Sequence, residues 1–153
     1  MLYKKRGKDN MQDKVMVIIK NEDNKYFLLK GSDTDPQFKE SFWHFITGAV
    51  EDIDNDIIDA VKREVKEETN LDINNIKYLN WILYYDSLGN KCKEKVFVAN
   101  NISNNIILNE ESIDYKWCTL EELLDSIKWY TSKDNLRYAL LNNEFKEEKE
   151  EYI

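Results

Sequence analysis

Apolar and polar residues follow two different periods along this chain, one typical of strands and the other of helices. Strands are predicted where short apolar runs are rich in β-branched and aromatic residues. These runs are 14–20, 26–29, 42–46, 76–85, 95–99 and 115–118. The polar, turn-forming residues 21–24 separate the first two runs, which predicts a β-hairpin. Residues 31–40 are expected to form a polar loop that contains the only proline, Pro36.

The helical period appears most clearly between residues 56 and 70. The apolar stripe consists of Ile57, Ala60, Val61 and Val65. Asp56, with Asp59 three residues later, has the form of a capping box at a helix start. Asn70 stands where helices often end, because asparagine adopts the left-handed conformation at low cost. The pattern therefore predicts a helix between Asp56 and Asn70.

Two more helices are predicted toward the C-terminus. The first covers 119–127 and begins with the capping-box pair Thr119 and Glu122, and the second covers 135–145. The charge run that follows, 146–151, is expected to be a solvated end. In chain order, strands are predicted before and after the central helix, and two more helices follow them. This order indicates an α/β fold whose mixed sheet is covered on both faces.

Length and composition are typical of a globular protein with one domain. The chain has 153 residues, of which 42% are hydrophobic and 12% aromatic, so it can bury a core without metal or disulfide staples. We expect one domain over 1–153, with residues 1–12 as a flexible tail. Cys92 and Cys118 are too few for a disulfide framework, and we expect free thiols in a reducing cytosol.

Charge and hydropathy restrict the partners. The N-terminus lacks the apolar run of a signal peptide and no stretch reaches transmembrane length, so we expect a cytoplasmic protein with no membrane partner. The net charge of −8 argues against a nucleic-acid partner. An acidic protein can still bind a small phosphorylated molecule if metal ions bridge the two negative partners. The sequence leaves open whether the protein is a monomer or a homodimer.

Candidate chemistry begins on the central helix. Glu64, Glu67 and Glu68 stand at i, i+3 and i+4, so their carboxylates share one face. Like charges at this spacing repel by roughly 0.2–0.5 kcal/mol per pair, and a hard divalent cation such as Mg²⁺ would turn that repulsion into a binding site. The alternative is an ordinary solvated face on which neighbouring lysines and an arginine neutralise the glutamates.

The central stretch resembles the Nudix box, a pattern of Gly, five residues, Glu, seven residues and then Arg-Glu-aliphatic-x-Glu-Glu-x-Gly-aliphatic. The positions that carry the resemblance are Gly48, Glu51, Ala60, Arg63, Glu64, Val65, Glu67, Glu68 and Leu71. Asn70 replaces the closing glycine of the pattern and can still cap the helix.

Two further departures concern the loop before the helix. The span from Gly48 to Arg63 is one residue longer than the pattern, which predicts an insertion in the Asp52–Asp56 loop. The loop glutamate of the pattern is absent, and Asp54 or Asp56 is expected to take its place with a shorter side chain. Both departures leave the helix carboxylates intact.

Shorter segments are similar to the bacterial dihydroneopterin triphosphate and dATP pyrophosphohydrolase branch of the family. Residues 42–43 and 47–51 look like that branch's approach to the box. Residues 111–117 look like its Glu-His-x-x-Tyr-x-Trp segment, with serine in place of histidine. Residues 135–139 look loosely like its Asn-Arg-x-Ala helix start, with one residue inserted. The family resemblance covers roughly residues 13–142.

The resemblance implies a Nudix fold, which is an α/β/α sandwich with a mixed central sheet. It also implies attack of water on a phosphorus of a pyrophosphate linkage, with Mg²⁺ as the cofactor and Mn²⁺ as its alternative. The residues agree, because phosphoryl transfer depends on charge neutralisation and positioning, and carboxylates on a rigid helix can hold the metal. The substrate implied is a small, phosphorylated, nucleotide-like molecule.

The same resemblance assigns the metal ligands. They are the backbone carbonyl of Gly48 and the side chains of Glu64, Glu67, Glu68 and Glu111. Glu110 is the neighbouring alternative to Glu111, which is also a candidate general base. Arg63 completes the catalytic set: it is expected to orient Glu64 or a neighbouring carboxylate by a bidentate contact, and the alternative is a plain i,i+4 pair with Glu67.

Other residues are candidates for the substrate. Lys30 and Arg137 could contact phosphate, and Trp43 could stack on a base or belong to the core. His44 is the only histidine and is expected to be structural, because it stands in an aromatic strand. Farther on, two aromatic residues of the segment 115–117 are expected in the core rather than at the ligand.

Three functions remain to be separated. The first is a Mg²⁺-dependent Nudix pyrophosphohydrolase that cleaves a nucleoside or pterin triphosphate and releases pyrophosphate. The second is the same chemistry on ADP-ribose or a dinucleoside polyphosphate. These two differ in their products, which are pyrophosphate with a monophosphate in one case and, for ADP-ribose, AMP with a sugar phosphate in the other. The third is a Nudix module that binds nucleotide or a protein partner without catalysis.

Overall fold

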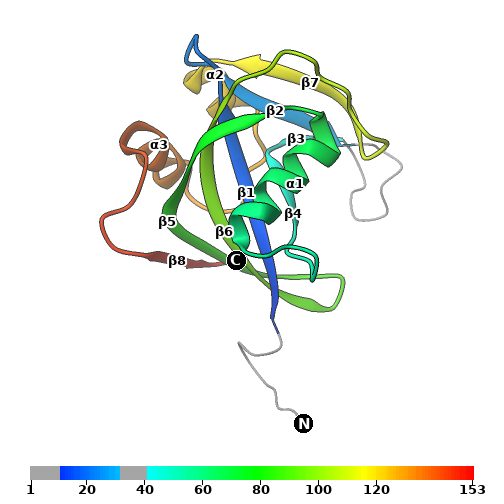
Figure 1. Ribbon diagram of the computed structural model, residues 1–153. Helices are drawn as coiled ribbons and strands as arrows, with labels where there is room; N and C mark the ends of the chain where they lie inside the picture. Colours follow the sequence, from blue (N-terminus) through cyan, green and yellow to red (C-terminus); the bar gives the residue numbers. More distant parts are fainter. Residues whose placement is uncertain (1–10, 32–40) are drawn as a thin grey trace.

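The computed structural model describes residues 11–31 and 41–153, and Figure 1 shows the path of the chain. Three helices and eight strands follow one another in this part of the chain. They are β1 (Gln12–Lys20), β2 (Tyr26–Gly31), β3 (Trp43–His44), β4 (Ile46–Ala49), α1 (Ile57–Thr69), β5 (Ile73–Ser87), β6 (Asn90–Asn101), β7 (Ser112–Cys118), α2 (Leu120–Ser126), α3 (Lys133–Asn142) and β8 (Lys149–Tyr152).

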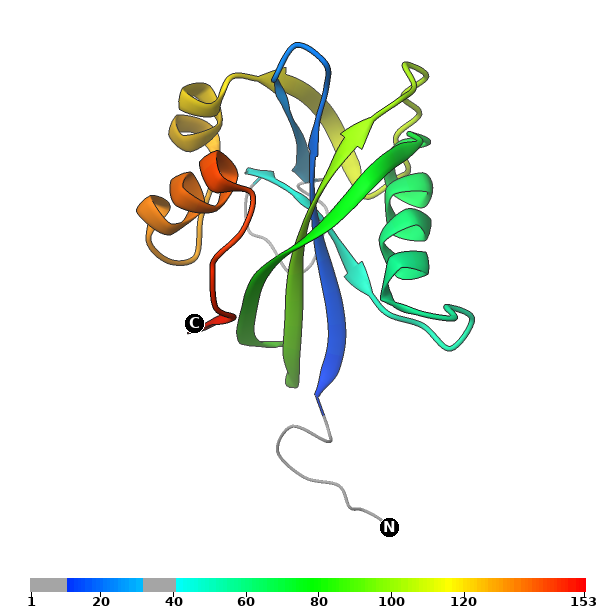
Figure 2. The same cartoon turned by 60° about the vertical axis from the view of Figure 1, so that its left-hand side comes forward.

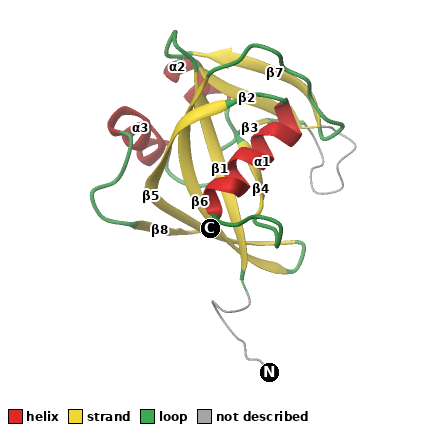
Figure 3. Cartoon of the chain, viewed as in Figure 1, coloured by secondary structure: helices red, strands yellow, loops and turns green. Residues whose placement is uncertain are grey.

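The strands form one mixed sheet (Figure 3). Its main path is β3-β2-β1-β6-β5-β8, while β4 pairs with β1 and β7 pairs with β2. The pairs β1·β6 and β5·β8 are parallel, and the other pairs are antiparallel. The hairpin predicted between the first two strands is present, with Lys20 opposite Tyr26.

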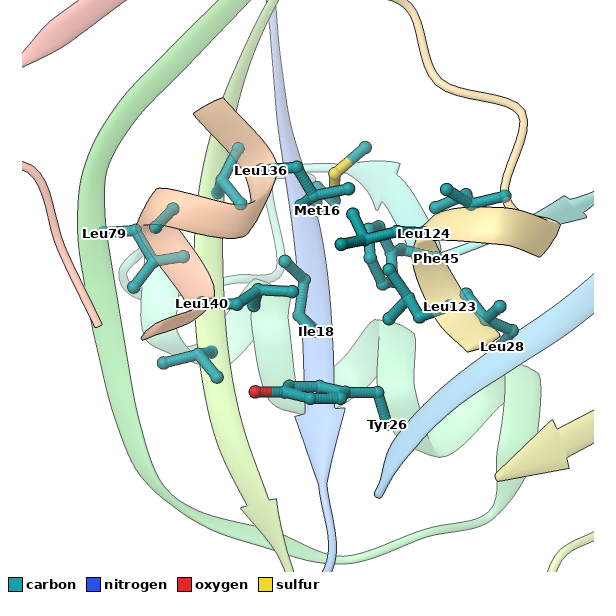
Figure 4. Close-up of a cluster of buried hydrophobic side chains, with 14 of the residues drawn as sticks. Met16, Ile18, Tyr26, Leu28, Phe45, Leu79, Leu123, Leu124, Leu136 and Leu140 are labelled. Atoms are coloured by element: carbon teal, nitrogen blue, oxygen red, sulfur yellow. The ribbon is translucent and has the colours of Figure 1, made fainter. Parts of the chain in front are cut away.

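Helices cover both faces of the sheet, so the α/β fold with a mixed central sheet is confirmed. Figures 1 and 2 show α1 against one face and α2 with α3 against the other. The division follows from the alternation of side chains along a strand. In β1, Val15 and Val17 belong to the core under α1, whereas Met16 and Ile18 belong to the core under α2 and α3. Figure 4 shows Met16 and Ile18 among the leucines of the two C-terminal helices.

The central helix has the ends that the sequence predicts. The Asp56 carboxylate accepts a hydrogen bond from the backbone N–H of Asp59 at 2.9 Å, which caps the first turn of α1. Asn70 lies in the left-handed region with φ 64°, and its N–H donates to the Lys66 carbonyl, which closes the last turn. The cap predicted for α2 is also present, with Thr119 and Glu122 bonded reciprocally.

Strands β5 and β6 are longer than the apolar runs that predict them. Their antiparallel ladder continues through polar residues to Ser87 opposite Asn90, next to the turn in which Gly89 has φ 83°. Backbone hydrogen bonds hold this polar part of the ladder and need no apolar side chains. An apolar run therefore predicts the buried middle of such a strand but not its ends.

The prediction of a solvated end is wrong for residues 149–151, because they belong to β8 and pair in parallel with β5. Glutamates hold this strand to its neighbour. Glu151 accepts a hydrogen bond from Nε1 of the fully buried Trp81 at 2.7 Å, and Glu150 accepts one from the Tyr84 hydroxyl at 2.6 Å. Charged side chains can thus lie in a strand when the neighbouring strand offers donors.

Smaller differences concern other boundaries. Gln12 already belongs to β1, so the predicted tail does not extend to residue 12. Its remainder, over 1–10, and the predicted loop around Pro36, over 32–40, lie outside the described residues. Helix α3 ends at Asn142 and is capped by Asn143, which has φ 59°, before the predicted end at residue 145. In the described part of the chain, no helix is both long and apolar enough to cross a bilayer.

We expect Glu151→Ala to lower the free energy of unfolding by about 1–3 kcal/mol, because it leaves the buried Trp81 N–H without an acceptor. Urea titration followed by fluorescence measures this change. Glu151→Gln retains an acceptor and should lose less. Glu147→Ala removes the same charge from an exposed residue and is the matched control. Equal stabilities for Glu151→Ala and Glu147→Ala would show that the Trp81 contact does not hold β8.

Candidate active site

A pocket of about 370 Å³, which is within the range of small-molecule sites, lies beside β4. It brings together the five residues expected to bind metal. They are Gly48 of β4, Glu64, Glu67 and Glu68 of α1, and Glu111, which precedes β7. Strand β4 pairs only with β1 in the described sheet, so it is an edge, and residues from both faces of the sheet line the pocket.

Gly48 allows the helix to approach the strand closely. A Cβ atom at this position would lie 1.9 Å from Cδ of Glu64, which is far inside van der Waals contact. No residue with a side chain fits there unless Glu64 moves. The glycine therefore lets the Glu64 carboxylate, on a residue only 8% exposed, reach the strand beside it.

Arg63 ties the start of α1 to the loop and to β4. Its Nε and Nη2 atoms donate to the two oxygens of Asp54 at 3.0 and 2.9 Å, and Nη2 also donates to the Ala49 carbonyl at 2.8 Å. Its Nη1 atom donates to Glu64 at 3.0 Å and to Glu67 at 3.2 Å. Both predicted contacts of Arg63, to Glu64 and to Glu67, are present, but the bidentate contact is with Asp54.

The two candidates for the missing loop acid have separate positions. Asp54 lies against Arg63, and its side chain is only 3% exposed, whereas Asp56 caps α1. The Arg63 guanidinium holds the pKa of Asp54 below its usual range, and Asp54 in turn raises the pKa of Arg63. Asp54 therefore stays ionised and fixes the arginine in place.

Glu68 is a buried carboxylate with an unused oxygen. The residue is 6% exposed, and within the described residues its Oε2 atom has no hydrogen-bond partner. Burial raises the pKa of Glu68 well above its usual range, and a hydrogen bond to Glu64 and the charges of Glu64, Glu111 and Glu67 raise it further. Burial also raises the pKa of Glu64, although Glu68 and Arg63 oppose that shift. Such a group is stable as an anion only beside added positive charge.

The donor set fits a hard divalent cation, but the carboxylates are not already arranged around one. Among the described residues, no three His, Cys, Asp or Glu side chains could hold a metal ion as they stand. Arg63 occupies one oxygen each of Glu64 and Glu67. The Glu67 side chain is 55% exposed and therefore free to turn, while the Oε2 atom of Glu68 has no hydrogen-bond partner among the described residues. Oxygen atoms are the ligands that Mg²⁺ takes.

Several predicted residues lie elsewhere. Lys30, Trp43, Arg137 and Glu110 are not among the described residues that line this pocket. Arg137 donates to both carboxylate oxygens of Glu121 on the exposed side of α2 and α3. The ammonium of Lys116 lies over the Trp43 ring at 4.4 Å, and that of Lys30 lies over it at 5.8 Å.

The two aromatic residues of β7 that were expected in the core both pack on Phe27, but the expectation is wrong for Tyr115, which is exposed, and Trp117 is only partly buried. The Tyr115 ring stacks on Phe27 with centroids 5.7 Å apart, although Tyr115 is 40% exposed, and Trp117 meets the same ring edge-on at 5.0 Å. His44 does line the pocket, and its Nδ1 atom lies 2.7 Å from the Phe45 carbonyl. That contact is consistent with a structural histidine.

Sequence reasoning missed the other side of the pocket. Its lining includes Lys14 of β1, and Trp129 and Tyr130 of the α2–α3 connection. Lys14 heads an ordinary strand pattern, and nothing in the sequence distinguishes it from other lysines. The adjacent pair Trp129 and Tyr130 was a signal that could have been used, because two large aromatic residues in a connection rarely lack a packing or binding role.

The family model described as the NUDIX domain matches residues 11–139. No curated protein sequence matches the chain closely enough to count as a relative.

Solved structures with a similar fold include three with named activities or families. The MutT protein from Methanosarcina mazei Go1 has a TM-score of 0.70 and 21% identity, covering 90% of this chain and 98% of that one. A C. elegans Ap4A hydrolase in a binary complex has a TM-score of 0.66 and 24% identity, covering 87% of this chain and 99% of that one. The E. coli dihydroneopterin triphosphate pyrophosphohydrolase has a TM-score of 0.66 and 20% identity, covering 86% of this chain and 98% of that one. At these identities the likeness is one of fold.

We expect Asp54→Asn to lower the free energy of unfolding at neutral pH. Because Arg63 depresses the folded pKa of Asp54, the stabilisation is present above the ordinary aspartate pKa of about 4 and is lost as the pH falls through the lowered value. The difference from wild type should therefore shrink in acid, which urea titrations at pH 7 and at about pH 3 would measure. Asp52→Asn, in the same loop with an exposed side chain, is the control. A difference that is the same at both pH values would contradict this account.

Proposed function

The chain belongs to the NUDIX domain family and is a hydrolase of phosphoanhydride bonds, and from that premise we propose a metal-dependent pyrophosphohydrolase of nucleoside or pterin triphosphates. The proposed cofactor is Mg²⁺, with Mn²⁺ as its alternative. The proposed reaction converts a triphosphate and water to a monophosphate and pyrophosphate. Its proposed catalytic residues are Arg63, Glu64, Glu67, Glu68 and Glu111, with the Gly48 carbonyl as a further ligand.

One observation carries the proposal: buried Glu68 lines one pocket together with the other acids, and its Oε2 atom has no hydrogen-bond partner among the described residues. Burying a carboxylate without a partner costs several kcal/mol in general, so a folded chain rarely keeps one without a use. Three of these acids stand on one helix, and the pKa of Glu68 is raised first by burial and then by the neighbouring acids. A pure binding module has no need of such a cluster.

Each of the proposed catalytic residues has its own role in hydrolysis. When bound, Mg²⁺ supplies positive charge to phosphate oxygens and makes water more acidic. Glu64, Glu67 and Glu68 would hold it, and Arg63 would keep Glu64 and the loop in position. Glu111, held by Asn109 through its backbone N–H at 3.0 Å, would accept the proton of the attacking water. The water oxygen then bonds to phosphorus as the bridging P–O bond breaks, and pyrophosphate leaves with that electron pair.

The substrate is tested with a panel of nucleoside and deoxynucleoside triphosphates, dihydroneopterin triphosphate, ADP-ribose and diadenosine polyphosphates. Release of pyrophosphate with a monophosphate, abolished by EDTA, is the expected result. AMP with a sugar phosphate would favour ADP-ribose hydrolysis, and cleavage of the diadenosine compounds would favour a dinucleoside polyphosphatase. No turnover with either Mg²⁺ or Mn²⁺ would favour a non-catalytic nucleotide-binding module.

We expect Glu68→Gln to reduce kcat by roughly 100-fold or more, since even residues that only support metal ligands contribute roughly 10–100-fold. The metal-free variant should be at least as stable as wild type, because it no longer buries an acid whose pKa is raised by burial and by its neighbours. Steady-state kinetics and urea titration measure the two effects.

Glu147→Gln changes an exposed glutamate outside the pocket and is the matched control for the Glu68 variant. Near wild-type turnover in Glu68→Gln would refute the assignment. A large loss of stability in Glu68→Gln would show instead that the residue is structural.

A further inference from the structure

The wall of the pocket that lies away from the proposed metal-binding acids contains a lysine, Lys14 of β1. Lys14 pairs with Ala49 across β1 and β4, one position from Gly48. Its side chain alternates with that of Val15 and therefore points to the face opposite α1. Lys14 thus reaches the pocket around the edge strand β4, on the side away from Glu64.

A fully buried carboxylate lies beside this lysine on the neighbouring strand. Glu94 of β6 is the register partner of Lys14 and is 1% exposed. It accepts a hydrogen bond from the Tyr85 hydroxyl at 2.7 Å, and the Lys14 ammonium lies 5.6 Å from the Tyr85 ring. The pKa of Glu94 is raised to about 7, because burial outweighs the opposing effects of the Tyr85 hydrogen bond and the Lys14 charge. Glu94 does not line the pocket and so cannot contact a ligand there. Its carboxylate instead attracts the Lys14 ammonium and keeps that side chain in position.

The Lys14 ammonium has no carboxylate partner at salt-bridge distance among the described residues, and it lies over the Tyr85 ring. An ammonium group carries three donors and no acceptor. A ligand group beside Lys14 must therefore offer oxygen or nitrogen acceptors.

A second donor lies on the same side of the pocket. The indole Nε1 of Trp129 is buried and has no partner among the described residues, and Trp129 lines the pocket. The surrounding wall is aromatic: Tyr130 stacks parallel to Tyr85 with centroids 6.4 Å apart, and Trp129 packs edge-on against Phe45 at 5.9 Å. Flat aromatic walls suit a planar ring, and two unsatisfied donors suit a ring that carries acceptors.

We propose that Lys14, positioned by the buried Glu94, selects substrates whose planar ring carries a carbonyl oxygen at purine position 6 or at pyrimidine or pterin position 4, as guanine, uracil and 4-oxo pterins do. It selects them over rings that carry an amino group at that position, as adenine and cytosine do. This inference rests on the proposed function for its substrate class. Lys14 is the specificity residue and Glu94 a positioning residue. An amino group opposite an ammonium leaves two donors facing each other, and such a mismatch discriminates strongly in a buried site.

The test uses two pairs of probes that carry the same phosphate and sugar and differ at the ring: GMP against AMP, and UMP against CMP. Dissociation constants are measured by calorimetry with Mg²⁺ present, so no turnover is needed. Wild type should bind the oxo member of each pair at least about tenfold more tightly, as one lost charge-assisted hydrogen bond predicts. Lys14→Met should reduce this preference to about twofold or less in both pairs.

Two further variants separate recognition from folding. Lys14→Met alone leaves the buried Glu94 carboxylate without a nearby positive charge. Adding Glu94→Gln removes that carboxylate, so the double variant should be more stable than Lys14→Met and should still lack the preference for the oxo member of each pair. Lys62→Met removes the same charge from an exposed position on α1 outside this pocket and should keep the preference.

Four results would overturn the proposal. They are an equal or reversed preference in wild type, no measurable binding of any probe by wild type, a preference that survives in the double variant, and an equal loss for both members of each pair. The last would place phosphate rather than the ring at Lys14. The triphosphate panel decides hydrolysis separately, so an oxo preference that depends on Lys14 would stand even if no turnover were found.

Discussion

The site depends on the close approach of α1 to β4. Gly48 leaves no room for a side chain between the strand and Glu64, and Arg63 closes the contact by binding Asp54 and the Ala49 carbonyl at once. A planar guanidinium with five donors can make these contacts together, which an ammonium cannot. Because the helix is held here, its carboxylates all face the same pocket, and everything else in the proposed chemistry follows from that position.

This approach also explains why the pocket has two unlike sides. Strand β4 is an edge, so one side of the pocket lies against α1 and collects acids, while the other lies against the sheet face under α2 and α3 and collects donors and aromatic rings. Among residues 11–31 and 41–153, Glu68 on the first side has no positive partner, and Lys14 on the second has no anionic partner at contact distance. A phosphorylated molecule with a planar ring, bound with a cation, would satisfy both sides.

How much the sequence predicts depends on how local the cause is. The caps of α1 and α2, the buried middles of β1, β2, β5 and β6 and the shared face of the three glutamates follow from neighbouring residues and are present, whereas the middle of β7 is exposed. The strand at 149–151 could not be predicted, because its glutamates bind Trp81 and Tyr84, which are about seventy residues away. The choice of Asp54 as the partner of Arg63, and the arrival of Lys14 in the pocket, likewise depend on pairing between distant segments.

The central claim is that these acids form one cation site, and Mn²⁺ tests it most directly. Substoichiometric Mn²⁺ broadens the amide signals of nearby residues in a ¹H–¹⁵N spectrum, whether or not the enzyme turns over. The account predicts that the signals of Gly48, Glu64, Glu67, Glu68 and Glu111 broaden first, while those of α3 stay sharp. Broadening centred on the acidic residues 147–151, or spread evenly over the protein, would contradict it.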